Sequence, residues 1–135
     1  MGFDQYHEPP DELPPQTRSF ARMCASLTEE AEAIGWYEQR LAVEPDPEAR
    51  AVMRDAQGEE FKHFSMDLEY LLRHTPVWRE IAQGVLFQGG DIVQHGESAE
   101  AEAGEDVEEG DGPAFGSAPS GDGWLGIGSL RGAGL

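Results

Sequence analysis

Apolar positions in the first third of the chain recur every three or four residues. They run from Phe20 to Leu41, and this spacing matches the 3.6-residue period of an α-helix. Pro14 and Pro15 stand just before this stripe, where proline favours the first helical turn. The pattern therefore predicts a helix that starts after these prolines and extends to about Val43.

A second helix is predicted to follow a short break. The segment 44–47 contains two prolines, which lack an N–H donor and push the preceding residue out of the α region. Asp46 is suited to cap the next helix, with Pro47 in its first turn. Apolar residues then continue at helical spacing to Leu71 and predict a helix that ends near His74. Such a short connection makes the two helices antiparallel.

A shorter third helix is predicted from Val77 to Phe87, closing at Gly89-Gly90, while residues 91–96 carry no clear pattern. The expected fold class is therefore all-α: an antiparallel two-helix hairpin plus a short third helix. Two such hairpins, one from each of two chains, would complete a four-helix bundle.

Composition divides the chain into four parts. Residues 1–12 are proline-rich and acidic and read as a flexible leader, and residues 13–96 form the helical domain. Residues 97–123 are almost entirely Glu, Asp, Gly, Ala, Ser and Pro, which predicts a disordered acidic linker because little apolar surface can be buried. In residues 124–135 apolar side chains reappear at the end of this tether, a pattern typical of a docking peptide.

The overall charge of the chain excludes some classes of partner. A formal net charge of −18 argues against nucleic acid, because phosphate binding needs clustered Lys and Arg. No stretch reaches the ~18 apolar residues of a membrane span, and the N-terminus lacks the pattern of a signal peptide. Cys24 is the only cysteine, so no intrachain disulfide can form. We therefore expect a soluble, intracellular protein whose acidic character suits metal cations.

Three side chains of the type that binds metals interrupt the helical stripes. Glu30 lies in the first stripe, and Glu60 lies in the second with His63 three residues later. One carboxylate plus Glu-x-x-His is half of the ligand set of carboxylate-bridged di-iron bundles, so a two-fold dimer would supply four carboxylates and two imidazoles. This mixture suits a redox pair of iron ions. The same spacing also fits a helix that is simply solvated on this side, and spacing alone leaves both interpretations open.

Other polar and aromatic residues lie near this half-site. Glu29 and Glu32 share a neighbouring face with Trp36 one turn further on; the pair fits either a place that gathers cations or a solvated acidic face. Tyr37 lies seven residues after Glu30, where it can hydrogen-bond to a ligand. Three histidines have no carboxylate at ligand spacing and are assigned no metal role: His7, His74 and His95.

The motifs taken together resemble the encapsulated ferritins, ferroxidase cargo proteins of encapsulin nanocompartments. The resemblance rests on EEAE at 29–32, WYEQR at 36–40, EEFKH at 59–63 and LEYL at 68–71. LGIGSLRG at 125–132 looks like an encapsulin-targeting peptide. Gly35 and Lys62 depart from the pattern of that family, which usually has acidic residues there.

The resemblance implies a ferroxidase, which oxidises Fe(II) to Fe(III) with dioxygen at a di-iron centre. This centre would be shared across a homodimer that forms a ferritin-like four-helix bundle, and the dimers would form an open ring of ten chains. It implies that Glu30, Glu60 and His63 are the iron ligands and that Tyr37 neighbours the centre. The product would be mineralised and stored in the lumen of an encapsulin shell in the cytoplasm. The shell protein would bind residues 124–135.

The resemblance also implies an outer site where metal ions enter, formed by Glu29, Glu32 and Trp36, with Ca²⁺ as a candidate metal. A second interpretation is a non-catalytic scaffold cargo whose carboxylates hold Ca²⁺ or Zn²⁺. A rubrerythrin-like peroxide reductase would need four cysteines for its rubredoxin-type iron site, and the single Cys24 argues against it.

Overall fold

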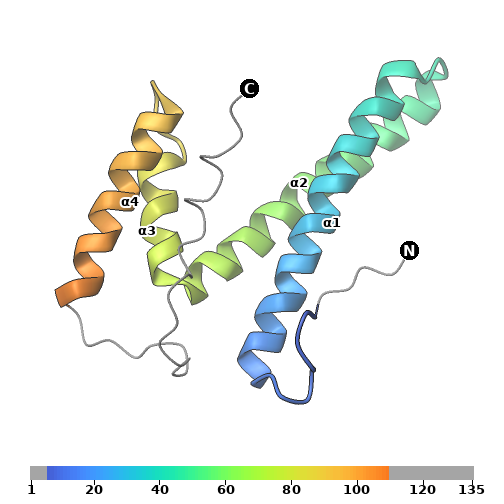
Figure 1. Cartoon of the computed structure of the whole chain (residues 1–135). Coiled ribbons are helices and arrows are strands. Elements are labelled where there is room, and N and C mark those ends of the chain that lie inside the picture. The colour runs from blue at the N-terminus through green and yellow to red at the C-terminus, as the bar shows by residue number, and fades with distance from the viewer. Residues whose placement is uncertain (1–5, 110–135) are drawn as a thin grey trace, which may run out of the picture.

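The computed structural model describes residues 6–109, which form two helical hairpins (Figure 1). The first hairpin consists of α1 (Pro15–Val43) and α2 (Pro47–His74), and the second of α3 (Pro76–Val85) and α4 (Ile92–Glu109). No strand occurs within this part of the chain. The prediction of an all-α fold is confirmed.

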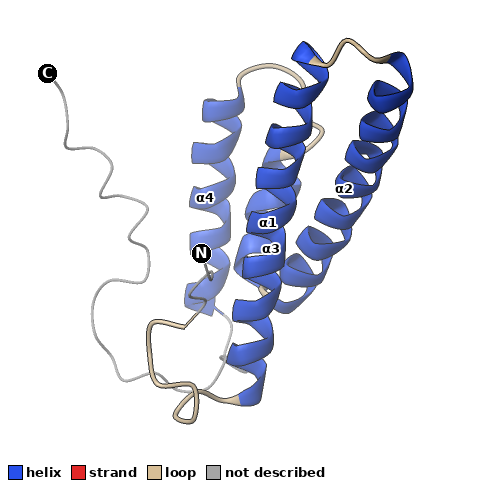
Figure 2. Ribbon diagram, turned by 90° about the vertical axis from the view of Figure 1, so that its right-hand side faces the viewer, coloured by secondary structure: helices blue, strands red, loops and turns tan. Residues whose placement is uncertain are grey.

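The connection between α1 and α2 is fixed from both sides. The carboxylate of Asp46 caps α2 by accepting hydrogen bonds from the backbone N–H groups of Glu48 and Ala49, at 3.3 and 3.2 Å. Arg50 Nη1 donates to the carbonyl oxygen of Glu44 at 3.2 Å. The proline break and the acidic cap therefore place both helix boundaries where the sequence predicts them, and α1 and α2 pack side by side along the hairpin (Figure 2).

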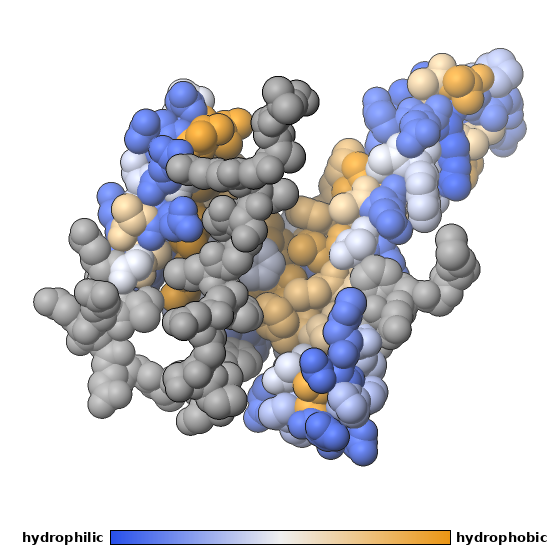
Figure 3. Space-filling view, in the orientation of Figure 1, coloured by the Kyte–Doolittle hydropathy of each residue, from blue (hydrophilic) through white to orange (hydrophobic). Residues whose placement is uncertain are grey.

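Only a thin core is buried between these helices. Leu71 is fully buried, and Ala25, Leu41 and Leu72 are nearly so. Several large apolar side chains of the same hairpin are instead exposed, among them Val52, Phe61 and Met66. Figure 3 shows apolar surface gathered between the two hairpins. Apolar exposure on this scale is typical of a surface that binds a partner. 

The α3 helix ends two residues earlier than the apolar stripe predicts. Phe87 adopts a left-handed backbone conformation with φ of 61°, which a helix cannot contain, and its side chain is fully exposed. Gly90 also has positive φ, at 93°, a conformation that glycine adopts without steric cost. The chain reverses here and leads into α4.

The prediction of a disordered linker from residue 97 is wrong for residues 97–109, which lie in α4. Ala99 and Ala103 are buried where α4 packs on α3. A Cβ atom added to Gly84 would lie 2.5 Å from the Cβ of Ala99, so the two helices approach very closely at this point. Alanine is the best helix former, and its small side chain allows such an approach. Composition alone hides this role of alanine.

The start of α4 has a cap that the sequence analysis left unassigned. The carboxylate of Asp91 accepts hydrogen bonds from the backbone N–H groups of Val93 and Gln94, at 3.0 and 3.1 Å. His95 Nε2 lies 2.8 Å from the carbonyl oxygen of Gly89. These contacts anchor α4 to the turn that precedes it.

The remaining sequence predictions for the ends of the chain lie outside the described residues. This applies to residues 1–5, to the linker from 110 to 123 and to the predicted docking peptide at 124–135. Among the helices that are described, none is both long enough and apolar enough to cross a membrane.

The close approach of α3 and α4 generates a prediction about Gly84→Ala. The new Cβ clashes with Ala99, and such overpacking costs about 1–3 kcal/mol, against a gain of about 1 kcal/mol in helix propensity. We expect amide hydrogen exchange in α4 to accelerate by up to about tenfold, the equivalent of about 1.4 kcal/mol. Gly104→Ala is the matched control, because nothing lies within 4 Å of its added Cβ. Equal exchange in both variants would contradict the packing described here.

Candidate metal centre

The fold brings Glu30 of α1 next to Glu60 and His63 of α2. One carboxylate oxygen from each glutamate and one imidazole nitrogen all lie within 4.8 Å of one another. Within residues 6–109 this is the one group of three or more His, Cys, Asp or Glu side chains close enough to hold a metal ion. The three residues that interrupt the apolar stripes therefore converge within a single chain.

The two α2 residues of the group differ in exposure. His63 Nδ1 lies 3.4 Å from Glu60 Oε2, on one face of α2. The side chain of Glu60 is 21% exposed, whereas that of His63 is 46% exposed. The group is thus sheltered on the side of α1 and open toward solvent at the imidazole.

Glu30 and Glu60 share one hydrogen bond, which shifts their pKa values in opposite directions. This bond is the largest of the effects that raise the pKa of Glu30 to about 7. Burial and the negative charges of Glu60 and Asp67 also raise this pKa, whereas the charge of His63 lowers it. The same bond lowers the pKa of Glu60, with a further contribution from His63. One carboxyl therefore retains a proton that the other accepts as a hydrogen bond, as expected where two carboxylates share a site. 

A buried glutamine holds the two helices in register one turn from Glu60. Gln57 Nε2 donates to the carbonyl oxygen of Ile34 at 3.3 Å and to Glu38 Oε2 at 3.0 Å. Its side chain is buried between α1 and α2. This cross-link fixes α2 against α1 and so positions Glu60 opposite Glu30.

Asp67 is a polar residue of this seam that the sequence analysis missed. Asp67 lies between Phe64 and Leu71 at helical spacing, and it is half-buried, as is the neighbouring Leu68. The Oδ2 atom of Asp67 is buried and, among the described residues, has no hydrogen-bond partner. Burial raises the pKa of Asp67, and the nearby His63 partly opposes this shift. A polar residue at helical spacing from Glu60 was the available signal.

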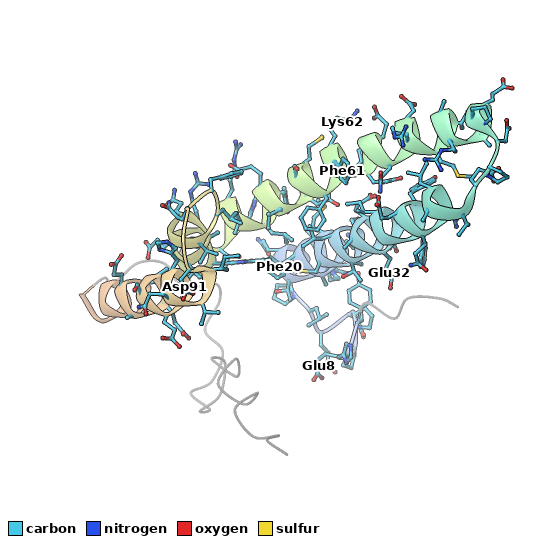
Figure 4. All side chains as sticks on the ribbon, turned by 90° about the horizontal axis from the view of Figure 1, so that it is seen from above. Glu8, Phe20, Glu32, Phe61, Lys62 and Asp91 are labelled. Carbon is cyan, nitrogen blue, oxygen red and sulfur yellow. The ribbon has the colours of Figure 1, made fainter. Side chains whose placement is uncertain are left out.

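The other residues singled out by the sequence lie on α1, outside the group of three ligands. Glu29 and Glu32 are exposed and Trp36 is half exposed. Glu32 projects from the outer side of α1, on the opposite side of the hairpin from Lys62 (Figure 4). The outer site proposed for these residues remains a prediction.

Tyr37 is half-buried, and the guanidinium of Arg40 lies over its ring at 5.3 Å. In the part of the chain that the structure covers, its hydroxyl makes no hydrogen bond to Glu30 or Glu60. A role for Tyr37 beside the centre therefore depends on a neighbouring chain or on bound metal, and it too remains a prediction.

The donor set fits a first-row transition metal. Two carboxylates and one imidazole are a mixed oxygen and nitrogen set, which suits iron in both of its common oxidation states. Three ligands per chain leave coordination positions open for water, a substrate or a second chain. The sheltered, hydrogen-bonded carboxylates are groups that a cation would stabilise.

Comparisons with known proteins show which family the chain belongs to. The chain is 39% identical over 128 residues to an encapsulated ferritin-like protein of Rhodospirillum rubrum, covering 93% of this chain and 87% of the relative. It is 41% identical over 91 residues to a ferritin-like protein of Thermotoga maritima, covering 67% and 80%. A crystal structure of a protein from Nitrosomonas europaea aligns with a TM-score of 0.64 and 36% identity, covering 66% of this chain and 98% of that one. The EncFtn-like family matches residues 5–89. The chain therefore belongs to the EncFtn-like, or encapsulated ferritin-like, family.

Proposed function

We propose that this protein is a ferroxidase that oxidises Fe(II) to Fe(III) with dioxygen for iron storage inside an encapsulin compartment. The observation that carries the proposal is the convergence of Glu30, Glu60 and His63 within 4.8 Å in a chain of this family. Iron is the substrate, and these three side chains are its binding groups.

A complete centre requires a second copy of the chain. One chain supplies three ligands, and the side chain of His63 is 46% exposed. Two copies related by a two-fold axis would bring four carboxylates and two imidazoles together, enough for two iron ions. The exposed apolar side chains of the hairpin, such as Phe61 and Met66, offer surface for this contact. We propose that such dimers assemble further into a ring of ten chains.

The residues of the chain then perform three tasks. Glu30 and Glu60 replace water around the arriving Fe(II), and the proton held by Glu30 is released as the cation binds. The carboxylates favour the ferric state, since hard oxygen donors stabilise the higher charge. Two iron ions held side by side supply two electrons to one dioxygen molecule.

The other residues singled out by the sequence act around this centre in the proposal. Glu29, Glu32 and Trp36 form an outer site where metal ions enter, with Ca²⁺ as a candidate occupant. Tyr37 borders the centre. Residues 124–135 bind the inner wall of the encapsulin shell and so deliver the ferroxidase to the lumen. The R. rubrum relative is named an encapsulated ferritin-like protein.

The first prediction from the proposed function concerns Glu60→Ala, which removes a ligand. We expect the rate of Fe(II) oxidation to fall by at least about a hundredfold, because even residues that only support a ligand contribute 10–100-fold. Oxidation is followed by oxygen uptake after anaerobic loading of the metal-free protein with Fe(II). Glu59→Ala is the matched control, since Glu59 is exposed and pairs with Lys62. Full activity in Glu60→Ala would overturn the proposal, and iron binding without oxygen uptake in the unmodified chain would favour a scaffold.

A second prediction separates binding of the protein to the shell from its ability to oxidise iron. Deletion of residues 124–135 should abolish co-purification with the shell protein and leave oxidation in solution unchanged. A chain carrying the same twelve amino acids in shuffled order controls for composition. If the deletion impairs oxidation, the tail belongs to the catalytic unit and the separation is wrong.

The third prediction concerns pH and the metal-free state. The pKa of Glu30 is about 7 in the fold, against an ordinary value of 4.5 for a glutamate, so the folded chain binds more protons in this interval. The stabilisation is complete below pH about 4.5 and is lost as pH rises through about 7. In urea titrations with chelator present, the midpoint of the unmodified chain should therefore fall relative to that of Glu30→Gln across this window. Glu32→Gln, at an exposed position, should follow the unmodified chain. Parallel curves for all three proteins would show that the Glu30 proton does not contribute.

A further inference from the structure

Asp67 carries a buried oxygen atom, Oδ2, that has no hydrogen-bond partner in the part of the chain that the structure describes. Within residues 6–109 it is the one buried side-chain nitrogen or oxygen atom in this state. Its Oδ2 atom is closed off from water and faces no donor among the described residues. A buried carboxylate in this state is destabilising unless a cation, a proton or a donor accompanies it. An apolar side chain would pack better at this position, so the carboxylate of Asp67 calls for a functional explanation.

The position of Asp67 points to the candidate metal centre. It lies four residues after His63 and seven after Glu60, and both intervals return to the same face of a helix. Four residues advance about 6 Å along the axis, and helical side chains lean back toward the N-terminus, which brings Asp67 nearer the ligands. Its charge reaches them, because Asp67 contributes to the raised pKa of Glu30, after the larger effects of Glu60 and burial. 

A count of charges shows what such a carboxylate can do. In each chain, ionised Glu30 and Glu60 carry two negative charges and neutral His63 carries none. They balance one Fe(II), whereas Fe(III) brings one more positive charge. A third carboxylate nearby balances that additional charge. Because Coulomb energy grows with the charge of the ion, this carboxylate stabilises a trivalent ion more than a divalent one.

We propose that Asp67 is the third carboxylate of each half-site and that it favours a bound trivalent cation over a divalent one. Asp67 acts through its charge as a positioning and selecting residue, next to the three ligands. The inference rests on the proposed function, since it requires the Glu30, Glu60 and His63 group to bind a metal.

The test uses two ions without redox chemistry, Zn²⁺ and Tb³⁺, titrated calorimetrically into the metal-free full-length chain. Binding at the centre is defined as the part that Glu60→Ala loses. For Asp67→Asn we expect the ratio of Tb³⁺ to Zn²⁺ affinity at this site to fall by about tenfold, the effect of one charge at about 10 Å. Asp55→Asn removes an equally negative but exposed residue of α2 and should leave the ratio unchanged.

A structural role for Asp67 predicts a different result. In that case Asp67→Asn would lower the stability of the metal-free chain to urea and leave the affinity ratio unchanged, which overturns the inference. Asp67→Thr, a second neutral variant, must give the same lowered ratio as Asn. If Glu60→Ala loses neither ion, the proposed metal centre itself fails and the role of Asp67 fails with it. If Glu60→Ala loses both ions while the ratio holds in both Asp67 variants, the inference on Asp67 fails alone.

Discussion

The structure depends on one constraint: two glutamates share the seam between α1 and α2, where apolar side chains would otherwise pack. Glu30 and Glu60 are partly sheltered from water and are hydrogen-bonded to each other. A sheltered carboxylate pair without a cation must retain a proton, and the pKa of about 7 for Glu30 expresses that requirement. The seam tolerates this conflict because its geometry is fixed elsewhere, by the Gln57 cross-link and by the Asp46 cap.

The same seam explains why, in our proposal, the chain must bind a second copy of itself. Three ligands leave an incomplete coordination shell, and the imidazole of His63 is open toward solvent. The core of the hairpin is thin, and apolar side chains as large as Phe61 are half exposed. A second copy that covers this surface would complete the ligand set and the apolar packing together. Assembly and metal binding would then stabilise one another, since each supplies what the other lacks.

The sequence predicted the first hairpin well because its signals are local. Prolines and an acidic cap define the ends of α1 and α2, and the 3.6-residue period identifies the faces that carry Glu30 and Glu60. Those faces meet in the structure, so the convergence of these two residues with His63 follows from spacing. The family resemblance is confirmed by the comparisons.

Two features could not be predicted from the sequence because they depend on tertiary contacts. α4 was read as linker, since alanine and glutamate resemble a solvated tether until Ala99 and Ala103 are packed against α3. Asp67 was missed because a 3.6-residue period allows either position 67 or position 68 to face inward. In the structure both residues are half-buried, and only the packing of the helices shows that the Oδ2 atom of Asp67 is closed off from water.

The central claim is that iron binds to Glu30, Glu60 and His63 between two copies of the chain. Crystals of the full-length protein, grown with Fe(II) in the absence of oxygen and measured at the iron absorption edge, test it most directly. We predict two anomalous peaks beside a two-fold axis, each contacted by these residues from both chains. No iron peak at these residues, or iron held entirely within one chain, would contradict the account.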